Sequence, residues 1–354
     1  MAEKVLIDGN EAVARGAIYA GCKAFFGYPI TPQSEVLEYM SHAMPEAGGV
    51  FLQTECELAA SGMTYGANAA GVRAMTATSG PGFSLMQEFI SHAAFNMVPM
   101  VIVDVMRLGP GVGAGGPGAQ HDYRQATKGG GHGDYRSIVL LPYSHQEIFD
   151  FMQLAFHLAD KHRMVVVVLT DFIMCRSMES VELRTLDFEP LPEKNWAVQT
   201  KEERTTERPP SHMLLTIKQR FTNQKEAYQK VVDSEVRYDT YQVEDAEFLL
   251  VSYGSSARMC RDAVDLARAE GLKVGLFRPI TGWPFPIEAL RKAASRVKKI
   301  LVVEDCQGQL VEDVECVIQG KVPVHLLGIW GRHLPGMTGV IYPERILQEV
   351  KNLR

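Results

Sequence analysis

Two kinds of segment alternate along residues 1–170. Short apolar runs, typical of strands, occupy residues 23–28, 50–54, 72–78, 99–105, 137–141 and 164–170. Helix-like segments separate them, at residues 10–21, after residue 31, and at 55–71, 83–95 and 146–161. Strands that are apolar on both faces, in alternation with helices, predict a parallel sheet that is covered by helices on both sides.

The pattern changes between residues 171 and 245. This stretch contains Pro190, Pro192, Pro209 and Pro210, the charge run KEERTTER at residues 201–208, and a polar helix at about 218–233. Such a composition is too charged for a core of its own and predicts a connecting segment.

A second alternation begins at Glu247. Its strand-like runs are residues 248–253, 273–278, 299–305 and 322–328, and its helix-like segments are residues 257–271 and 287–297. We therefore predict an α/β protein with a first domain at 1–180, a connecting segment at 181–245 and a smaller second α/β domain at 246–354.

Composition and charge narrow the classes of function. Hydrophobic residues make up 46% of the chain and charged residues 22%, with a net charge of -6 and a pI near 6.0. This balance argues against a nucleic-acid partner. The N-terminus lacks the pattern of a signal peptide, and no apolar run approaches the length of a membrane span. We expect a cytoplasmic protein with no membrane contact.

The six cysteines carry no recognisable metal signature. They are Cys22, Cys56, Cys175, Cys260, Cys306 and Cys316, and no C-x-x-C occurs. We expect free, mostly buried thiols and no iron-sulfur or zinc site within this chain.

Three loops follow predicted strands, which is where open α/β sheets bind ligands. They are residues 28–32, residues 76–82, and a long run from Arg107 onwards that has six glycines between Gly109 and Gly118. The glycine-rich run is neither a P-loop nor a dinucleotide fingerprint, because no G-K-[ST] or G-x-G-x-x-G stands in the required context. It permits close backbone approach to a ligand.

Several residues in these loops have two interpretations each. Thr31 can be the N-cap of a helix that has Pro32 at its first position, which is a sufficient structural role. Arg107 can grip a carboxylate or be an ordinary surface arginine. Glu55 and Glu57 bracket the start of a predicted helix, where negative charge is favourable.

A group of polar residues accompanies the third loop. His121, Asp122, His132 and Asp134 are predicted to cluster near it, but their spacing fits no helical metal motif, so we predict no metal site.

The motifs GYPITP, a glutamate pair before a small-residue helix, TSGPG, VDVMRLGPG, TKGGGHGDYR and RPITGWPFP stand in one order. Together they resemble the alpha-type chain of the 2-oxoacid:ferredoxin oxidoreductases over nearly the whole sequence. The nearest type is the branched-chain (2-oxoisovalerate) one, with the 2-oxoglutarate type next. The resemblance implies a pyrimidine-type domain of the thiamine diphosphate superfamily, followed by a transketolase C-terminal-like domain.

The resemblance also implies cofactors and partners. No Gly-Asp-Gly occurs in the chain, which agrees with a beta chain that holds the diphosphate and its Mg²⁺. Gamma- and delta-type chains would carry ferredoxin-like [4Fe-4S] clusters, CoA would be the co-substrate, and ferredoxin would accept the electrons. The chain would be active only with its partner chain, in the decarboxylation of a 2-oxoacid.

Residue roles follow from the same resemblance. Glu57 matches the glutamate that hydrogen-bonds N1′ of the aminopyrimidine and so promotes loss of the thiazolium C2 proton. Thr31 matches a threonine that reaches the substrate's 2-oxo or carboxylate oxygen, and Arg107 an arginine that faces the carboxylate. Glu55, roughly 200° round the predicted helix from Glu57, cannot do the same work. The expected cofactor contacts are Tyr28, Pro29, Ser79 and Gly80.

One departure and two alternatives remain. Relatives commonly have Gly-Pro-Ser-Thr-Gly after the arginine, whereas this chain has GPGVGAGGPG, without hydroxyls. The alternatives to the ferredoxin-linked subunit are the E1 component of an NAD-linked dehydrogenase and a non-catalytic scaffold with the same fold. The presence of Glu57 disfavours the scaffold.

Overall fold

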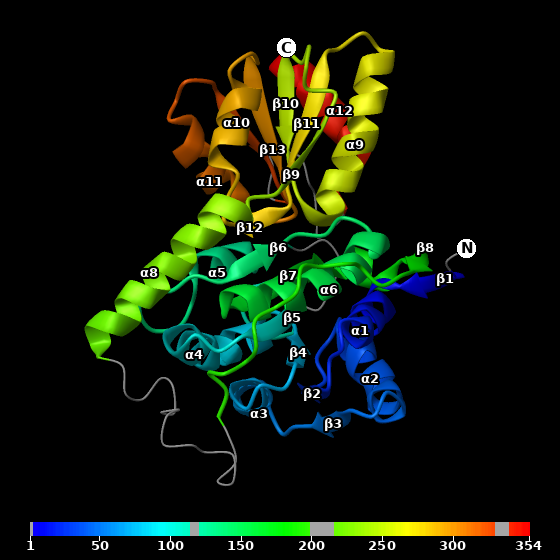
Figure 1. Cartoon of the computed structure of the whole chain (residues 1–354). Helices are drawn as coiled ribbons and strands as arrows, with labels where there is room; N and C mark the ends of the chain where they lie inside the picture. Colours follow the sequence, from blue (N-terminus) through cyan, green and yellow to red (C-terminus); the bar gives the residue numbers. More distant parts are fainter. Residues whose placement is uncertain (1–2, 114–119, 199–215, 330–339) are drawn as a thin grey trace.

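A computed structural model describes residues 3–113, 120–198, 216–329 and 340–354. It contains a sheet of seven strands, a smaller sheet of five strands, which lies above the larger one in Figure 1, and a two-stranded sheet. The α/β class predicted from the sequence is confirmed.

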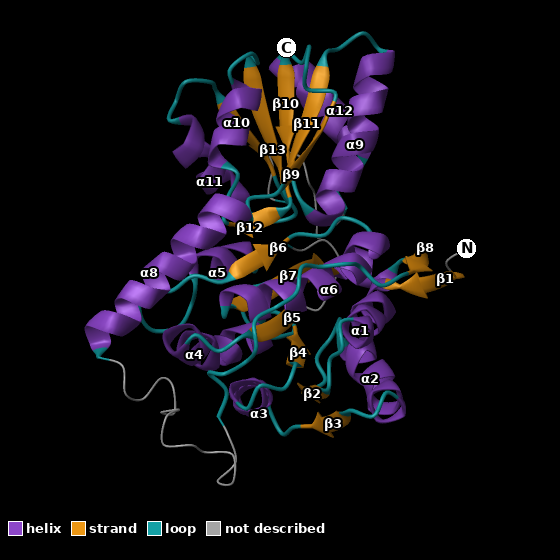
Figure 2. Cartoon of the chain, in the orientation of Figure 1, coloured by secondary structure: helices purple, strands orange, loops and turns teal. Residues whose placement is uncertain are grey.

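The seven-stranded sheet has the order β12-β6-β7-β5-β4-β2-β3. Six of its strands are parallel, as the apolar runs predicted: β2 (Ala24–Gly27), β3 (Val50–Gln53), β4 (Ala74–Thr78), β5 (Met100–Met106), β6 (Ile138–Leu140) and β7 (Val165–Asp171). The seventh, β12 (Thr281–Trp283), comes from far along the chain and pairs antiparallel with β6. Figure 2 shows β12 beside β6, beneath the smaller sheet.

Helices cover both faces of this sheet. One face carries α1 (Gly9–Tyr19), α2 (Ser34–Glu46) and α6 (His145–His162); the other carries α3 (Glu57–Ala69), α4 (Pro81–Asn96) and α5 (Tyr123–Lys128). Strand β5 shows why its sequence is apolar throughout: Val101 and Val103 belong to the first core, and Met100 and Ile102 to the second.

The smaller sheet has the order β14-β13-β10-β11-β9. Its strands are β9 (Tyr238–Tyr241), β10 (Phe248–Val251), β11 (Val274–Pro279), β13 (Lys299–Val303) and β14 (Val324–Leu327), and only β9 runs antiparallel to its neighbour. Its helices are α9 (Gly254–Ala269), α10 (Ile287–Ala294), α11 (Leu310–Ile318) and α12 (Pro343–Leu353).

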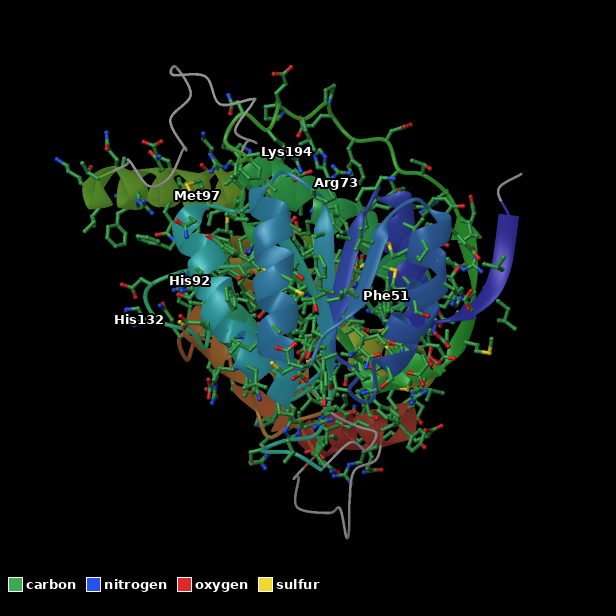
Figure 3. All side chains as sticks on the ribbon, turned by 90° about the horizontal axis from the view of Figure 1, so that it is seen from below. Phe51, Arg73, His92, Met97, His132 and Lys194 are labelled. Carbon is green, nitrogen blue, oxygen red and sulfur yellow. The ribbon has the colours of Figure 1, made fainter. Side chains whose placement is uncertain are left out.

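The start of the chain and the connecting region contain structure that the sequence pattern did not predict. β1 (Glu3–Asp8) pairs antiparallel with β8 (Met178–Leu183), just after α7 (Phe172–Arg176). Further on, the Lys194 ammonium lies 2.7 Å from Asp160, which also binds Arg73 at 2.8 Å, on the underside shown in Figure 3. The predicted polar helix is α8 (Ile217–Ser234). The run KEERTTER, Pro209 and Pro210 lie outside the described residues.

Buried polar contacts join the two sheets. Arg278 on β11 donates two hydrogen bonds to Glu147 on α6, at 2.9 and 2.8 Å, and its guanidinium stacks 4.0 Å over the Tyr143 ring. Tyr123 donates to Asp313 at 2.9 Å. Because one core cluster also contains residues of both sheets, the interface between them is both packed and hydrogen-bonded.

Two further predictions concern features outside the sheets. The cysteines are free, and Cys22, Cys175, Cys260 and Cys306 are buried, as expected. In the portion of the chain that the structure describes, no helix combines the length and the apolar character needed to cross a membrane.

Candidate functional site

The three loops that follow β2, β4 and β5 meet at the carboxyl edge of the larger sheet. Arg107, directly after β5, donates from Nη1 to the backbone oxygen of Thr31, at 2.9 Å. A Cβ built on Gly80, in the loop after β4, would lie 3.1 Å from Cγ of Arg107. Residues 31, 80 and 107, far apart in sequence, therefore share one location.

The first loop is fixed by its backbone, and the capping role expected for Thr31 is wrong. Helix α2 begins at Ser34, and its N-cap is Gln33, which donates to the Tyr28 carbonyl at 2.8 Å. Asn10 holds the Pro32 carbonyl at 2.9 Å. Gln33 and Asn10 therefore hold the backbone of this loop. The Thr31 side chain is exposed and makes no capping hydrogen bond to α2.

Pro29, next to Tyr28 in the same loop, is exposed, whereas Tyr28 is half-buried. Neither residue lines a cavity among those described below, so their expected contact with a cofactor stays a prediction.

Glu57 is the first residue of α3 and is 5% exposed. A Cβ on Gly82 would lie 2.5 Å from Oε1 of Glu57, so the carboxylate lies directly against the Gly-Pro-Gly turn. The side chain thus stands at the positive end of the α3 macrodipole.

The geometry assumed for the glutamate pair needs correction. Glu55 lies two residues before α3 begins and is exposed, so it does not occupy a helical position 200° from Glu57. Glu55 and Glu57 are still expected to have different roles, but for another reason: of the two, Glu57 is buried against the turn at residues 80–82, whereas Glu55 is exposed.

Polar groups near this turn are buried without partners. The hydroxyls of Thr78 and Ser79 and Nε of Arg107 make no hydrogen bond among the described residues. An unpaired buried polar group costs free energy, and native proteins keep few of them. Their concentration at the ends of β4 and β5 fits a site that a polar ligand completes.

Two buried carboxyls accompany Arg107. Asp122 accepts from the Arg107 backbone N–H at 3.4 Å, and burial raises its pKa to about 6 against the opposing charge of Arg107. Asp104 on β5 is fully buried; burial, with Asp122 adding to it, raises its pKa well above the usual range. Asp104 was not among the predicted site residues, although an acid within the apolar run MVIVDVM was the available signal.

A cavity of about 590 Å³ opens beside Arg107. Its walls come from residues 107–111, from Gly80, Pro81 and Ser84, from the segment around His121 and Arg124, and from Gln307 to Gln309 in the loop between β13 and α11. Arg124 is paired with Glu312, and burial lowers the pKa of His121. The cavity is therefore built jointly by both halves of the chain. Residues 114–119 of the glycine-rich run lie outside the described residues.

The predicted cluster of His121, Asp122, His132 and Asp134 does not form. His121 and Asp122 flank the cavity beside Arg107, whereas His132 and Asp134 line a separate depression of about 490 Å³ with Phe95. Figure 3 shows His132 next to His92, on the outer side of α4. Among the residues that the structure places, no three side chains of metal-ligating type gather at one point.

Comparison with protein families gives two matches. Residues 15–247 match the model described as pyruvate flavodoxin/ferredoxin oxidoreductase, thiamine diphosphate-binding. Residues 246–336 match the model of pyruvate:ferredoxin oxidoreductase core domain II. Together the two models span most of the chain.

Individual relatives are similar over their full length. The chain is 47% identical to a ketoisovalerate oxidoreductase subunit VorB of Methanothermobacter marburgensis, covering 95% of this chain and 96% of the relative. It is 37% identical to a 2-oxoglutarate synthase subunit KorA of the same organism, covering all of both chains.

A solved structure has the same fold. It is the 2-oxoglutarate:ferredoxin oxidoreductase of Magnetococcus marinus with 2-oxoglutarate, coenzyme A and succinyl-CoA bound, which is 27% identical and superposes with a TM-score of 0.84. The match covers 99% of this chain but 65% of the longer chain, so the present chain spans about two thirds of that protein.

Proposed function

We propose, since the chain belongs to the pyruvate flavodoxin/ferredoxin oxidoreductase family, that it is the alpha-type subunit of a 2-oxoacid:ferredoxin oxidoreductase. The enzyme converts a 2-oxoacid and CoA to acyl-CoA and CO₂, with electrons passing to ferredoxin. The observation that carries the proposal is the convergence of Thr31, Gly80 and Arg107 at one edge of the sheet, with Glu57 buried against the neighbouring turn.

Glu57 is proposed to hold and move the proton at N1′ of the aminopyrimidine. Thiamine diphosphate, when bound, would supply the electron-sink chemistry for decarboxylation that the protein's own side chains lack. The unpartnered hydroxyl of Thr78, which lies against Gly82 as the Glu57 carboxylate does, and that of Ser79 in the adjoining turn fit a polar ring in this position. Gly80 and the Tyr28–Pro29 loop complete the proposed contacts with the cofactor.

Arg107 is proposed to bind the substrate carboxylate. Its guanidinium is buried, with Nε unpartnered, and the hydrogen bond to Thr31 O fixes its direction. A planar guanidinium that is already oriented binds a carboxylate through two hydrogen bonds at low entropic cost. Thr31, whose carbonyl accepts this hydrogen bond, is exposed, and its hydroxyl can donate to a substrate oxygen.

The cavity beside Arg107 favours a branched-chain monocarboxylate. Among the described lining residues, Arg124 is neutralised by Glu312 and His121 has a lowered pKa, which leaves Arg107 as the cation for a single carboxylate. Pro81, Leu108 and Pro110 add apolar surface for an isopropyl group. The higher identity to the ketoisovalerate subunit than to the 2-oxoglutarate subunit agrees.

The second candidate substrate is 2-oxoglutarate. It is supported by the 37% identical relative and by the solved structure with that substrate bound. It requires a second cation for the distal carboxylate, and Arg124 would have to leave Glu312 to provide it.

A partner chain is proposed to cover the outer face of α3 and α4 and to hold the diphosphate and Mg²⁺. Leu58, Met63, Leu85 and Phe95 are 42–53% exposed on these two helices. Exposed apolar side chains on two helices that pack against each other are typical of an interaction surface. Glu57 begins α3, so a chain docked there brings its diphosphate site next to the proposed pyrimidine site. The [4Fe-4S] clusters are assigned to gamma- and delta-type chains.

The division into domains is part of the proposal. The family models meet at residues 246–247, which supports the second domain at 246–354, with 1–180 as the first domain and 181–245 as the connection. Strand β12 then crosses from the second domain to the sheet of the first.

The test is turnover by the purified complex with a panel of 2-oxoacids, followed by reduction of an electron-accepting dye. We expect CoA-dependent reduction with 2-oxoisovalerate and a kcat/KM at least tenfold lower with 2-oxoglutarate. Reduction without CoA, or NAD-linked turnover in its place, would contradict the proposal.

A further inference from the structure

Gln120 sits between the two sheets and uses every polar atom that it has. Its Oε1 accepts from Ser256 Oγ at 3.1 Å and from the Asp305 N–H at 2.9 Å. Its Nε2 donates to the Tyr253 carbonyl at 3.0 Å and to Asp171 Oδ2 at 3.4 Å. The backbone N–H donates to Asp305 O at 2.9 Å, and the carbonyl accepts from the Tyr253 hydroxyl at 3.3 Å.

The surroundings of Gln120 are built for this contact. Gln120 is fully buried. Gly254, at φ +58°, begins helix α9, and a Cβ there would lie 2.7 Å from Gln120 Nε2 and 2.7 Å from Asp171 Oδ2. Only glycine lets the start of α9 approach so closely. Asp171 also accepts from the Ser255 N–H at 2.8 Å, which ties the end of β7 to the same point.

The residues after Gln120 form a wall of the cavity. Gln309 donates to the His121 carbonyl at 2.7 Å and accepts from the Arg124 N–H at 2.6 Å. Asp122 accepts from the Arg107 N–H at 3.4 Å. The chain therefore runs from an anchor in the smaller sheet directly into the residues that orient Arg107.

We propose that Gln120 is a positioning residue, which holds the segment from His121 to Gln125 against the smaller sheet and so sets the distance between this wall and Arg107. This inference depends on the proposed function for the identity of the ligand. Gln120 itself would contact neither substrate nor cofactor. It would act by positioning residues 121–125, which form a wall of the cavity. A buried amide with all of its hydrogen bonds made is costly to replace and holds one geometry.

The test replaces Gln120 in the assembled complex with methionine (Gln120→Met), which keeps the length of the side chain and removes its hydrogen bonds. We expect KM for the 2-oxoacid to rise about 10- to 100-fold with a smaller change in kcat. Amide hydrogen exchange should quicken in residues 121–128 and stay unchanged in β5 and β13. Gln348→Met, at an exposed position on α12, is the matched control.

A second variant covers failure of the first to assemble. Ser256→Ala removes one of the four side-chain hydrogen bonds, and KM should rise about two- to fivefold. An unchanged KM in both variants, or faster exchange spread evenly over both sheets, would overturn the proposal. The exchange measurement needs no substrate and therefore tests the role of Gln120 by itself. Absence of 2-oxoacid turnover in the wild-type complex would refute the proposed function without deciding the role of Gln120.

Discussion

The Glu57 carboxylate and the α-carbon of Gly82 are so close that a methyl group on Gly82 would lie 2.5 Å from Glu57 Oε1. Gly82 therefore fixes where the carboxylate can be. Gly82→Ala should displace Glu57 and destabilise the chain by about 1–3 kcal/mol through overpacking. Urea unfolding of the isolated chain measures the loss. Gly66→Ala on α3, where the methyl group meets no atom within 4 Å, should stabilise it by about 0.5–1 kcal/mol; equal effects of the two changes would contradict the packing.

Glu57→Gln keeps the shape of the side chain and removes its ability to exchange a proton with N1′. Exchange of the cofactor's C2 proton in the assembled complex, followed by NMR after acid quench, should slow by about 10²- to 10⁴-fold. Glu55→Gln is the matched control, and its exchange rate should be near normal, because Glu55 is exposed and precedes α3. The reverse pattern would assign the role to Glu55.

Arg107→Ala should raise KM for the 2-oxoacid more than it lowers kcat. A charge-assisted hydrogen bond contributes roughly 1.5–3 kcal/mol, so kcat/KM should fall about 10- to 150-fold. Arg107→Lys should recover only part of the loss, because an ammonium lacks the bidentate geometry. Steady-state kinetics of the complex measures both, with the exposed Arg296→Ala as the control. An unchanged KM would remove Arg107 from the site.

Met63→Glu should block assembly with the beta chain and leave the isolated chain folded. The side chain is 42% exposed on α3, one of the two helices proposed to bind the partner, and a buried unpaired charge is costly. Val232→Glu on α8, where the valine is 43% exposed, is a matched control. Co-purification of the beta chain measures the difference, and normal assembly of the Met63 variant would place the interface elsewhere.

The stability of the chain should fall as the pH rises from about 4 to about 7, in part because of Asp305. Burial, with the nearby Asp171 charge, raises the pKa of Asp305 to about 7. The folded state thus binds a proton that the unfolded state has released above its pKa of about 3.9. Stability from this group is present below pH 4 and lost as the pH approaches 7, by at most about 1.4 kcal/mol per pH unit.

Asp305→Asn isolates that contribution, since the buried Asp104 and Asp122 titrate in the same direction in both proteins. The difference in unfolding free energy between variant and wild type should grow in favour of the variant from pH 5 to pH 8. A difference that is constant with pH would show that Asp305 does not titrate in this range.

The sequence alone determined the sheet and the location of the site along the chain. β5 and β7 are apolar at nearly every position because each contributes side chains to two cores, and this pattern is local. Turn residues after β2 and β4, and Arg107 after β5, indicated the carboxyl edge of the sheet, because each follows directly on a recognisable strand in the sequence. The ordered motifs identified the family and, through it, indicated Glu57 for the role proposed above.

Only the tertiary structure decided how these pieces meet. The pairing of β12 with β6, the hydrogen bond from Arg107 to Thr31 across 76 residues of sequence, and the anchor at Gln120 have no local pattern. Helix ends were also misplaced: Thr31 is not a cap, and Glu55 is outside α3. The secondary-structure propensity of a residue depends on its neighbours in the sequence. Contacts at the edge of a sheet, or between two sheets, depend instead on which backbone groups of distant segments remain unpaired.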